Sequence, residues 1–442
     1  FILRGQPNMS IPLAPLEPAA NKTADNRPAD KDKKAEPPKK AAPKQAVKPA
    51  ERLVSLDAYR GVIMLAMASA GFGLAGVAKH FPDDPLWQTL GFQFSHVEWK
   101  GGGFWDMIQP SFMFMVGVSM AYSYASRQVR GQSYPRMLAH AVFRSFVLVA
   151  LGVFLSSKSS SHTNFVFPNV LCQIGLGYTF LFLLWNRRPV WQLLAAVLIL
   201  AADWGLFFAY PTPPADFDYS TVNLSANWPH LEGRAAHWDK HTNAAAAADR
   251  VFLNWFPRDE PFTLNDGGYT TLNFVPSLAT MIFGLLAGGL MRSDRGKAAK
   301  LGWLVGAGLV CLGAGYLLDR YDICPIVKRI WTPSWAVYST GWTLLMLAGF
   351  YLVVDVIGLR RAALPLVVVG MNSILMYCMS QLIGSSNGWI AQNLQRHFGD
   401  GIFTAYGHLD PIYSPILRAS LVLFVMWLVC VWLYRQKIFV RI

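Results

Sequence analysis

The 442-residue sequence has few charged residues, because Asp, Glu, Lys and Arg together make up only 15% of it. A soluble domain carries about a quarter, so this scarcity argues against a single water-soluble globular fold. Hydrophobic residues instead make up 53%. They gather in blocks of roughly twenty, each long enough to cross a hydrocarbon core of ~30 Å at 1.5 Å per residue. The sequence therefore predicts an all-α polytopic membrane protein.

Three other features of the sequence bear on the class of protein. The five cysteines form no C-x-x-C pair and no disulfide-like array, so they indicate no redox compartment. No internal repeat relates the first five apolar blocks to the last five, which disfavours a transporter built on inverted repeats. The excess of 39 Lys and Arg over 26 Asp and Glu does not indicate a nucleic-acid partner, because much of it lies in a lysine-rich tail and in short connections.

The apolar blocks predict a bundle of about ten transmembrane helices. Their approximate ranges are 61–78, 104–126, 136–156, 168–186, 190–210, 272–291, 299–318, 334–354, 363–384 and 415–434. Alternate connections are short and rich in Arg and Lys, and the positive-inside rule places these connections and both termini in the cytoplasm. The three long connections then face outward, at 79–103, 211–271 and 385–414.

Two segments stand apart from the spans. Residues 1–50 are rich in Pro, Lys and Ala and are predicted to form a disordered basic tail, with a transmembrane domain over 51–442. The outward segment 211–271 is long for a connection. A small ordered cap and an irregular surface loop fit its sequence equally well.

Ionisable side chains near the spans are functional candidates, because each costs ~2.5–3.5 kcal/mol in hydrocarbon. Asp57 and Arg60 are three residues apart and can pair on one helix face, and Arg60 can alternatively bind a phosphate. Gly61 permits a close approach by a neighbour or ligand. Arg144 lies ~12 Å deeper in its span than Arg136, so it requires an acidic partner or an anion inside the bundle.

The most informative segment is 95–106, with the sequence SHVEWKGGGFWD. Its three glycines permit a turn where an outer connection meets a span, and they place His96 at the outer membrane level. An imidazole can take a proton from an amine or a hydroxyl near neutral pH, although an interfacial histidine can also serve packing alone. Contact between His96 and Asp106, ten residues apart, depends on how the glycines fold.

Two further polar pairs are weaker candidates. Asn372 and Ser373 interrupt an apolar block, where they can bind a substrate oxygen or pack between helices. His237 and His241 have the i, i+4 spacing of zinc ligands, but no third ligand is evident, so no metal site is predicted.

Several of these residues fall in motifs that resemble the heparan-α-glucosaminide N-acetyltransferase family of transmembrane acetyltransferases and its bacterial relatives. The matching blocks, in chain order, are RLVSLDAYRG (52–61), HVEWKG (96–101), NVLCQIG (169–175), ADR (248–250) and GMNSILMY (370–377). The histidine block and the last block, in this order, make the resemblance specific.

The resemblance implies acetyl transfer from cytoplasmic acetyl-CoA to the amine of a glucosamine-type sugar or glycan on the outer side. It makes His96 the catalytic residue and Asp106 its partner or an acceptor ligand. The residues expected to hold acetyl-CoA are Asp57, Arg60, Arg127 and Arg144. The residues expected to bind the acceptor are Trp99, Asn372 and Ser373.

The resemblance also implies acetyl-CoA as co-substrate without a metal, and membrane lipid and a second copy of the chain as partners. The location it implies is a bacterial inner membrane. The sequence departs from the family pattern at 171–173 and 271–274, so heparan itself is not implied as the acceptor. The alternative function is a transporter or flippase for a glycan or lipid-linked sugar. In that case Pro110 and Pro276 would break helices around a midplane site.

Overall fold

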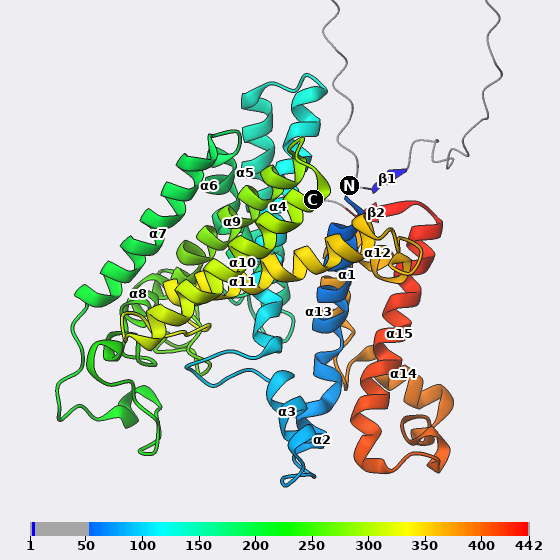
Figure 1. Cartoon of the computed structure of the whole chain (residues 1–442). Coiled ribbons are helices and arrows are strands. Elements are labelled where there is room, and N and C mark those ends of the chain that lie inside the picture. Colours follow the sequence, from blue (N-terminus) through cyan, green and yellow to red (C-terminus); the bar gives the residue numbers. More distant parts are fainter. Residues whose placement is uncertain (1, 5–52, 441–442) are drawn as a thin grey trace, which may run out of the picture.

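The computed structural model describes residues 2–4 and 53–440. Within these ranges the chain is a helical bundle with one two-stranded antiparallel sheet, formed by β1 (Ile2–Arg4) and β2 (Ile438–Val440) (Figure 1). Of the predicted tail, only Ile2–Arg4 is described, and residues 5–50 lie outside the described ranges. The predicted all-α class is confirmed.

The α-helices fall along the described chain in this order: α1 (Val54–Ala68), α2 (Leu74–Ala78), α3 (Pro85–Gln93), α4 (Ile108–Val129), α5 (Tyr134–Ser156), α6 (Val170–Leu184), α7 (Pro189–Ala209), α8 (Ala244–Phe252), α9 (Phe274–Arg292), α10 (Lys297–Arg320), α11 (Pro333–Phe350), α12 (Leu364–Met371), α13 (Ser373–Leu382), α14 (Trp389–Phe398) and α15 (Ser414–Arg435). A π-helical turn, η7 (Tyr351–Val356), continues α11. The short 3₁₀ helices are η1 (Ala70–Gly73), η2 (Phe104–Met107), η3 (Tyr219–Val222), η4 (Gly233–Trp238), η5 (Leu253–Trp255), η6 (Thr271–Asn273), η8 (Asp400–Gly407) and η9 (Pro411–Tyr413).

The described residues contain six helices that are long and apolar enough to cross a membrane, or eight if each of two bent pairs is one span. The bent pairs are α1 with η1 and α2, at 44°, and α12 with α13, at 78°. The other two predicted spans coincide with α4 and α6. Helix α6 has only 15 residues. Helix α4 is long enough at 22 residues, but it carries four serines and Arg127, and most of its residues are buried inside the bundle.

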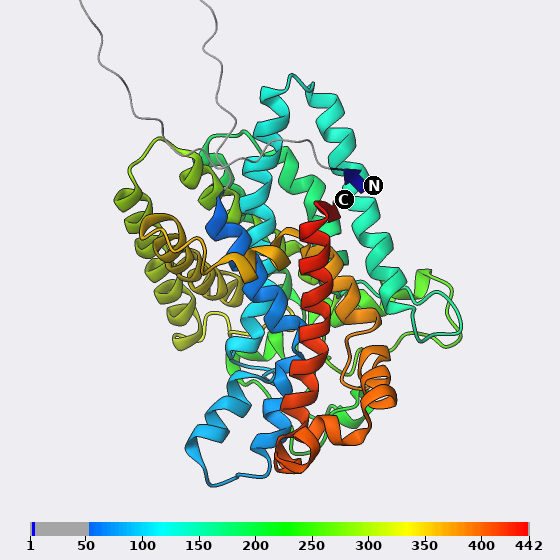
Figure 2. The same ribbon diagram turned by 90° about the vertical axis from the view of Figure 1, so that its right-hand side faces the viewer.

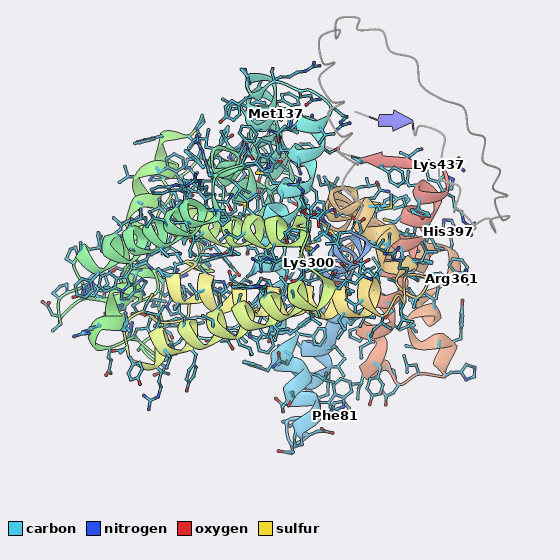
Figure 3. The ribbon with its side chains drawn as sticks, turned by 45° about the horizontal axis from the view of Figure 1, so that its top comes forward. Phe81, Met137, Lys300, Arg361, His397 and Lys437 are labelled. Carbon is cyan, nitrogen blue, oxygen red and sulfur yellow. The ribbon has the colours of Figure 1, made fainter. Side chains whose placement is uncertain are left out.

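The ends of the bundle differ as the pattern of connections predicts. The short α4–α5, α6–α7 and α9–α10 connections lie at the same end as β2, whereas the long segments 79–103, 211–271 and 385–414 lie at the other (Figure 1). Met137, near the α4–α5 turn, and Phe81, between α2 and α3, mark these opposite ends (Figure 3). The basic connections and the long segments are thus separated along the helix axes.

Helix α1 packs closely on α12 through two glycines. A Cβ on Gly61 would overlap the carbonyl oxygen of Leu366, and a Cβ on Gly370 would overlap that of Asp57. Small residues let helix backbones approach in a membrane, so the close approach predicted at Gly61 is to α12. Helix α15 runs along η1, α12 and α13 (Figure 2).

The prolines proposed as helix breakers do not break the spans. Pro110 and Pro276 lie in the first turns of α4 and α9, where the missing N–H has no intrahelical partner to lose. The 78° bend falls instead at Asn372, between α12 and α13.

Segment 211–271 is ordered, with η3, η4, α8 and η5 along it. Its Trp238 is fully buried and packs with Phe207 of α7, whose ring plane lies within 7° of parallel. We call this segment the cap. Asn243 begins α8 by accepting a hydrogen bond from the Ala246 amide at 3.0 Å, which is the usual role of an asparagine N-cap. The cap packs on the same end of the bundle that carries His96.

Candidate active site

The three glycines bring the 94–103 segment back onto the bundle. Gly101 has a left-handed φ of 105°, and its N–H donates to the Ile326 carbonyl at 2.8 Å. A Cβ on Gly102 would overlap the ring of Trp335 in α11. The chain then enters η2, where Asp106 Oδ2 accepts from the Gly103 N–H at 3.2 Å, as an acidic third residue does in a helix-capping box.

This turn brings His96 and Asp106 into contact. His96 Nδ1 lies 2.8 Å from Asp106 Oδ1, and the carboxylate is 1% exposed while the imidazole is 44% exposed. Asp106 Oδ2 also accepts from the Val97 N–H at 3.3 Å. A carboxylate can only accept, so in the neutral tautomer that donates from Nδ1 to Asp106 the lone pair is on Nε2. The imidazole is thus oriented with a basic nitrogen on an accessible side chain.

Lys328 is the third member of this cluster, and the sequence did not predict it. Its Nζ lies 3.0 Å from Asp106 Oδ1 and 3.0 Å from His96 Nδ1. Lys328 comes from the 321–332 connection before α11, far from the motif in sequence. The neighbouring Arg329 donates to the Val97 carbonyl at 3.2 Å and to the Gly267 carbonyl, so this connection clamps the histidine segment from outside.

A cavity of about 560 Å³ lies between α1, α4, α5, α6 and the α12–α13 bend. Its residues on α4 recur at helical spacing from Phe112 to Arg127, which is ~22 Å along the axis. A volume in this range fits a substrate of cofactor size. The charged side chains that line it are Asp57, Arg60, Arg127, Arg130 and Arg144. Four guanidinium groups against one carboxylate give the cavity an excess of positive charge.

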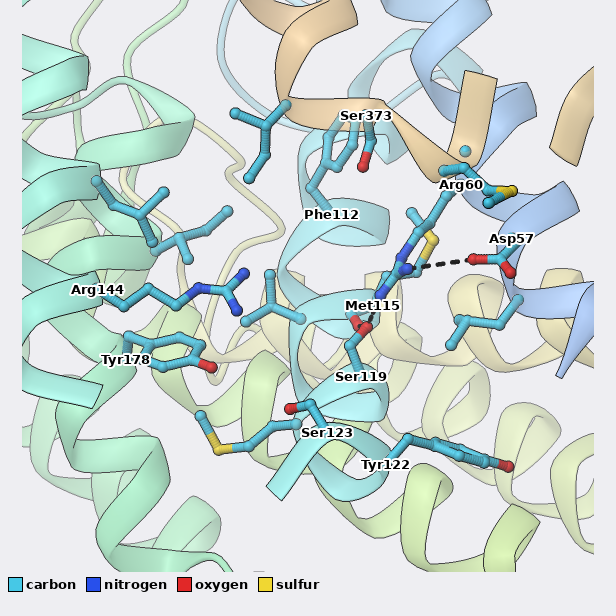
Figure 4. Close-up of a pocket in the computed structure, with 18 of the residues that line it drawn as sticks. Asp57, Arg60, Phe112, Met115, Ser119, Tyr122, Ser123, Arg144, Tyr178 and Ser373 are labelled. Carbon is cyan, nitrogen blue, oxygen red and sulfur yellow. Dashed lines mark hydrogen bonds and ion pairs between the residues drawn. The ribbon is translucent and has the colours of Figure 1, made fainter. Parts of the chain in front are cut away.

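Arg60 and Arg144 point into the cavity from opposite sides (Figure 4). Arg60 forms the predicted ion pair with Asp57 at 3.4 Å and also donates to the hydroxyl of Ser119. Arg144 packs over the Tyr178 ring at 4.7 Å, and its buried Nε has no hydrogen-bond partner among the described residues. A guanidinium held this way in a bundle is suited to bind an anion.

Arg127 lies in the last turn of α4, where polar side chains hold its guanidinium at one end of the cavity. One guanidinium nitrogen lies 2.7 Å from His140 Nε2, and another donates to Gln132 Oε1 at 3.3 Å. The predicted donor-binding set of Asp57, Arg60, Arg127 and Arg144 therefore lines one cavity.

The predicted acceptor-binding residues do not share a site. Ser373 lines the cavity. Asn372 is fully buried and joins β2, donating to the Ile438 carbonyl at 3.2 Å and accepting from the Val440 N–H at 3.0 Å. Trp99 is 4% exposed, and its indole N–H donates to the Trp238 carbonyl at 3.1 Å. Asn372 thus anchors the C-terminal strand, and Trp99 joins the histidine segment to the cap.

The cavity does not reach the histidine cluster. Neither His96, Asp106 nor Lys328 lines it, and its outermost residue on α4 is Phe112. Phe112 lies six positions after Asp106, which is ~9 Å along a helix. The arginine-lined cavity and the histidine cluster thus lie at different levels along the axis of α4, with packed side chains between them.

The cap histidines His237 and His241 contact backbone carbonyl oxygens. His241 places its two ring nitrogens 2.7 Å and 2.9 Å from the carbonyl oxygens of Val222 and Asn265, and His237 Nδ1 lies 2.9 Å from that of Tyr210. No group of three or more possible metal ligands occurs within the part of the chain that the structure describes.

Asp249 of α8 ties the cap to η6 and leads to a first prediction. Its Oδ2 accepts from the Thr271 N–H at 2.9 Å, and burial raises its pKa to about 6 although this hydrogen bond lowers it. The folded protein therefore binds this proton more tightly than the unfolded chain, so stability falls as the pH rises from about 4 to 6.

Asp249→Asn keeps an acceptor oxygen and removes the charge. We expect it to stabilise the fold by about 2–3 kcal/mol at pH 7, from a two-unit pKa shift at 1.36 kcal/mol per unit, and to have no effect near pH 4. Thermal melts of both proteins across this range measure the difference. A melting-temperature difference that stays constant with pH would contradict the prediction.

Sequence comparisons confirm the family resemblance. Residues 52–226 match the family model described as the catalytic part of heparan-alpha-glucosaminide N-acetyltransferase. The human heparan-alpha-glucosaminide N-acetyltransferase is 23% identical over 436 residues, which cover 88% of this chain and 60% of the human protein. The mouse protein is 25% identical over 370 residues, which cover 74% of this chain and 53% of that protein. The chain thus spans a little over half the length of these relatives.

Proposed function

We propose, on the premise that this chain carries the catalytic pattern of the heparan-α-glucosaminide N-acetyltransferases, that it is a membrane-embedded N-acetyltransferase. It transfers the acetyl group of acetyl-CoA to the amine of a glucosamine-type sugar or glycan. The observation that carries the proposal is the pairing of one accessible imidazole with a buried carboxylate at 2.8 Å. This pair lies just before the N-terminal end of α4, and a cavity lined by arginines runs along the same helix.

The cavity is the donor site. Arg60, Arg127 and Arg144 line the cavity and supply the charge and the planar donors that phosphates require. The donor enters from the end with short basic connections, which the positive-inside rule assigns to the cytoplasm together with both termini. The membrane we propose is a bacterial inner membrane.

The acceptor reaches His96 from the end covered by the cap. His96 Nε2 takes the proton of the sugar amine as its nitrogen bonds to the acetyl carbon and the carbon–sulfur bond of the donor breaks. The same proton then neutralises the departing thiolate of CoA. Asp106 holds the ring in this orientation throughout. For the acetyl group to reach His96, the pantetheine arm of acetyl-CoA must extend past the level of Phe112 on α4.

The proposal is tested by incubating purified protein with labelled acetyl-CoA and a panel of amino sugars. Release of CoA thiol that depends on an amino sugar supports acetyl transfer. Movement of a sugar or lipid-linked glycan across vesicles without thiol release would instead support the transporter, to which the bent α12–α13 span is suited.

Arg60→Ala gives a more local prediction. We expect it to weaken acetyl-CoA binding by about 10- to 100-fold, since a hydrogen bond to a charged group contributes about 1.5–3 kcal/mol. The KM for the amino sugar is expected to stay near that of the wild type. Initial-rate kinetics with each substrate varied in turn measure both quantities, and the opposite pattern would overturn the assignment of the cavity to the donor.

A further inference from the structure

The buried ammonium group of Lys328 faces both members of the histidine pair. The residue is 5% exposed, and its Nζ makes an ion pair with Asp106 at 3.0 Å. On another side it lies 5.8 Å from the centre of the Tyr269 ring. A buried ammonium is costly unless it is paired, and Asp106 provides that pairing.

The connection that carries Lys328 is fixed by its own hydrogen bonds. The Val327 N–H donates to Thr332 Oγ1 at 3.0 Å, and Ser334 Oγ donates to the Pro325 carbonyl at 2.6 Å. The Gly101 N–H joins this connection to the histidine segment through the Ile326 carbonyl. The ammonium group is therefore held in place rather than free to swing away.

The net charge of the cluster formed by His96, Asp106 and Lys328 depends on the ammonium group of Lys328. With neutral His96, the carboxylate of Asp106 and the ammonium of Lys328 cancel. Without Lys328 the carboxylate alone would face the imidazole and favour its protonated form. With Lys328 present, an imidazolium would lie 3.0 Å from a second cation.

The other charged groups around His96 do not replace this effect. Arg329 carries the same sign as Lys328 and binds the Val97 carbonyl. Glu98 is exposed, so water screens its charge.

We propose that Lys328 is a positioning residue that neutralises Asp106 and thereby keeps His96 uncharged, in the form that accepts a proton. The inference rests on the proposed function only for the role of His96 as a base. The ionisation of His96 itself is measured without any substrate.

The test compares Lys328→Gln with the wild type by NMR of the protein with labelled histidine, the His96 signal being assigned by its loss in His96→Ala. Gln can still donate to Asp106 but carries no charge. We expect His96 to be half-protonated at a pH about one unit higher in the variant, a tenfold change in proton affinity. The acidic limb of the acetyl-transfer pH–rate profile moves the same way, with the rate recovering at high pH.

Two further variants complete the design. Lys328→Arg keeps the positive charge and is expected to titrate like the wild type. Lys100→Gln removes another lysine of the same region, one that is 46% exposed and pairs with Asp319 at 3.2 Å, and is expected to change nothing. If Lys328→Gln does not fold, a wild-type titration of His96 in Lys328→Arg supports the inference, and a shift of a full unit there overturns it.

An unshifted His96, or one half-protonated at lower pH in folded Lys328→Gln, would overturn the inference even if the enzyme transfers acetyl groups. A wild-type protein without acetyl transfer, but with the expected shift in the variant, refutes the proposed function and leaves the role of Lys328 supported. The two failures are thus distinguishable.

Discussion

Replacing His96 by alanine is expected to lower the acetyl-transfer rate at saturating substrate by about 10²- to 10⁴-fold, the usual contribution of a general base. The side chain is 44% exposed, so its removal leaves no large buried cavity and the fold is expected to persist. Acceptor-dependent release of CoA thiol measures the rate, and thermal melting checks the fold. Turnover like that of the wild type would exclude His96 as the base.

The cap provides a matched control for this substitution. His230 also pairs its Nδ1 with a buried carboxylate, Asp239 Oδ2, at 2.6 Å, and its side chain is 29% exposed. Its ring packs against Tyr219 with centroids 3.9 Å apart. His230→Ala removes the same kind of pair and is expected to keep turnover near the wild-type rate. An equal loss in both variants would mean that histidine pairs matter here for structure rather than for catalysis.

The sequence predicts the parts of the site that follow from local patterns. Asp57 and Arg60 are one turn apart on α1, so their ion pair follows from helix geometry alone. The depth of Arg144 follows from counting residues along α5. The three glycines predict a turn after His96, but the sequence leaves open whether that turn brings Asp106 to the ring, because the contact depends on where Gly101 and Gly102 pack.

Lys328 shows what local patterns cannot reveal. It lies 232 residues from His96, in a connection for which the sequence predicts only a short loop beside an apolar block. Its contact with Asp106 is produced by the packing of Gly101 on Ile326 and of Gly102 on Trp335. The structural signal of its role is its low exposure of 5%. Lysine side chains are almost always exposed, so this burial could not be predicted from the sequence.

The two departures from the family pattern also meet in space. Gln173 of α6 donates to the carbonyl of Thr271 at 3.3 Å, and the N–H of Thr271 donates to Asp249. Residues 171–173 and 271–274 are about a hundred positions apart, so the sequence presents them as separate differences. In the fold they form one contact beneath the cap, on the side from which the proposed acceptor enters.

Arg144 is the residue whose removal is expected to affect the donor most selectively. Its guanidinium has a buried Nε without a hydrogen-bond partner among the described residues, and it packs on Tyr178 at 4.7 Å. An anion in the cavity would pair with the charge of this guanidinium. We expect Arg144→Gln to weaken acetyl-CoA binding by about 10- to 100-fold, as loss of a charged hydrogen bond does, and to weaken binding of acetyl-pantetheine very little, because that thioester lacks the nucleotide phosphates.

Arg136→Gln is the control, since it removes an exposed arginine of the same helix that does not line the cavity. Direct binding of both thioesters to the three proteins at several salt concentrations measures the contrast. Arg144→Gln should also reduce the dependence of acetyl-CoA binding on salt, since one charge contact with phosphate is lost. Equal weakening of acetyl-CoA and acetyl-pantetheine would show that Arg144 shapes the cavity, and the phosphates would then have to lie nearer Arg60 and Arg127.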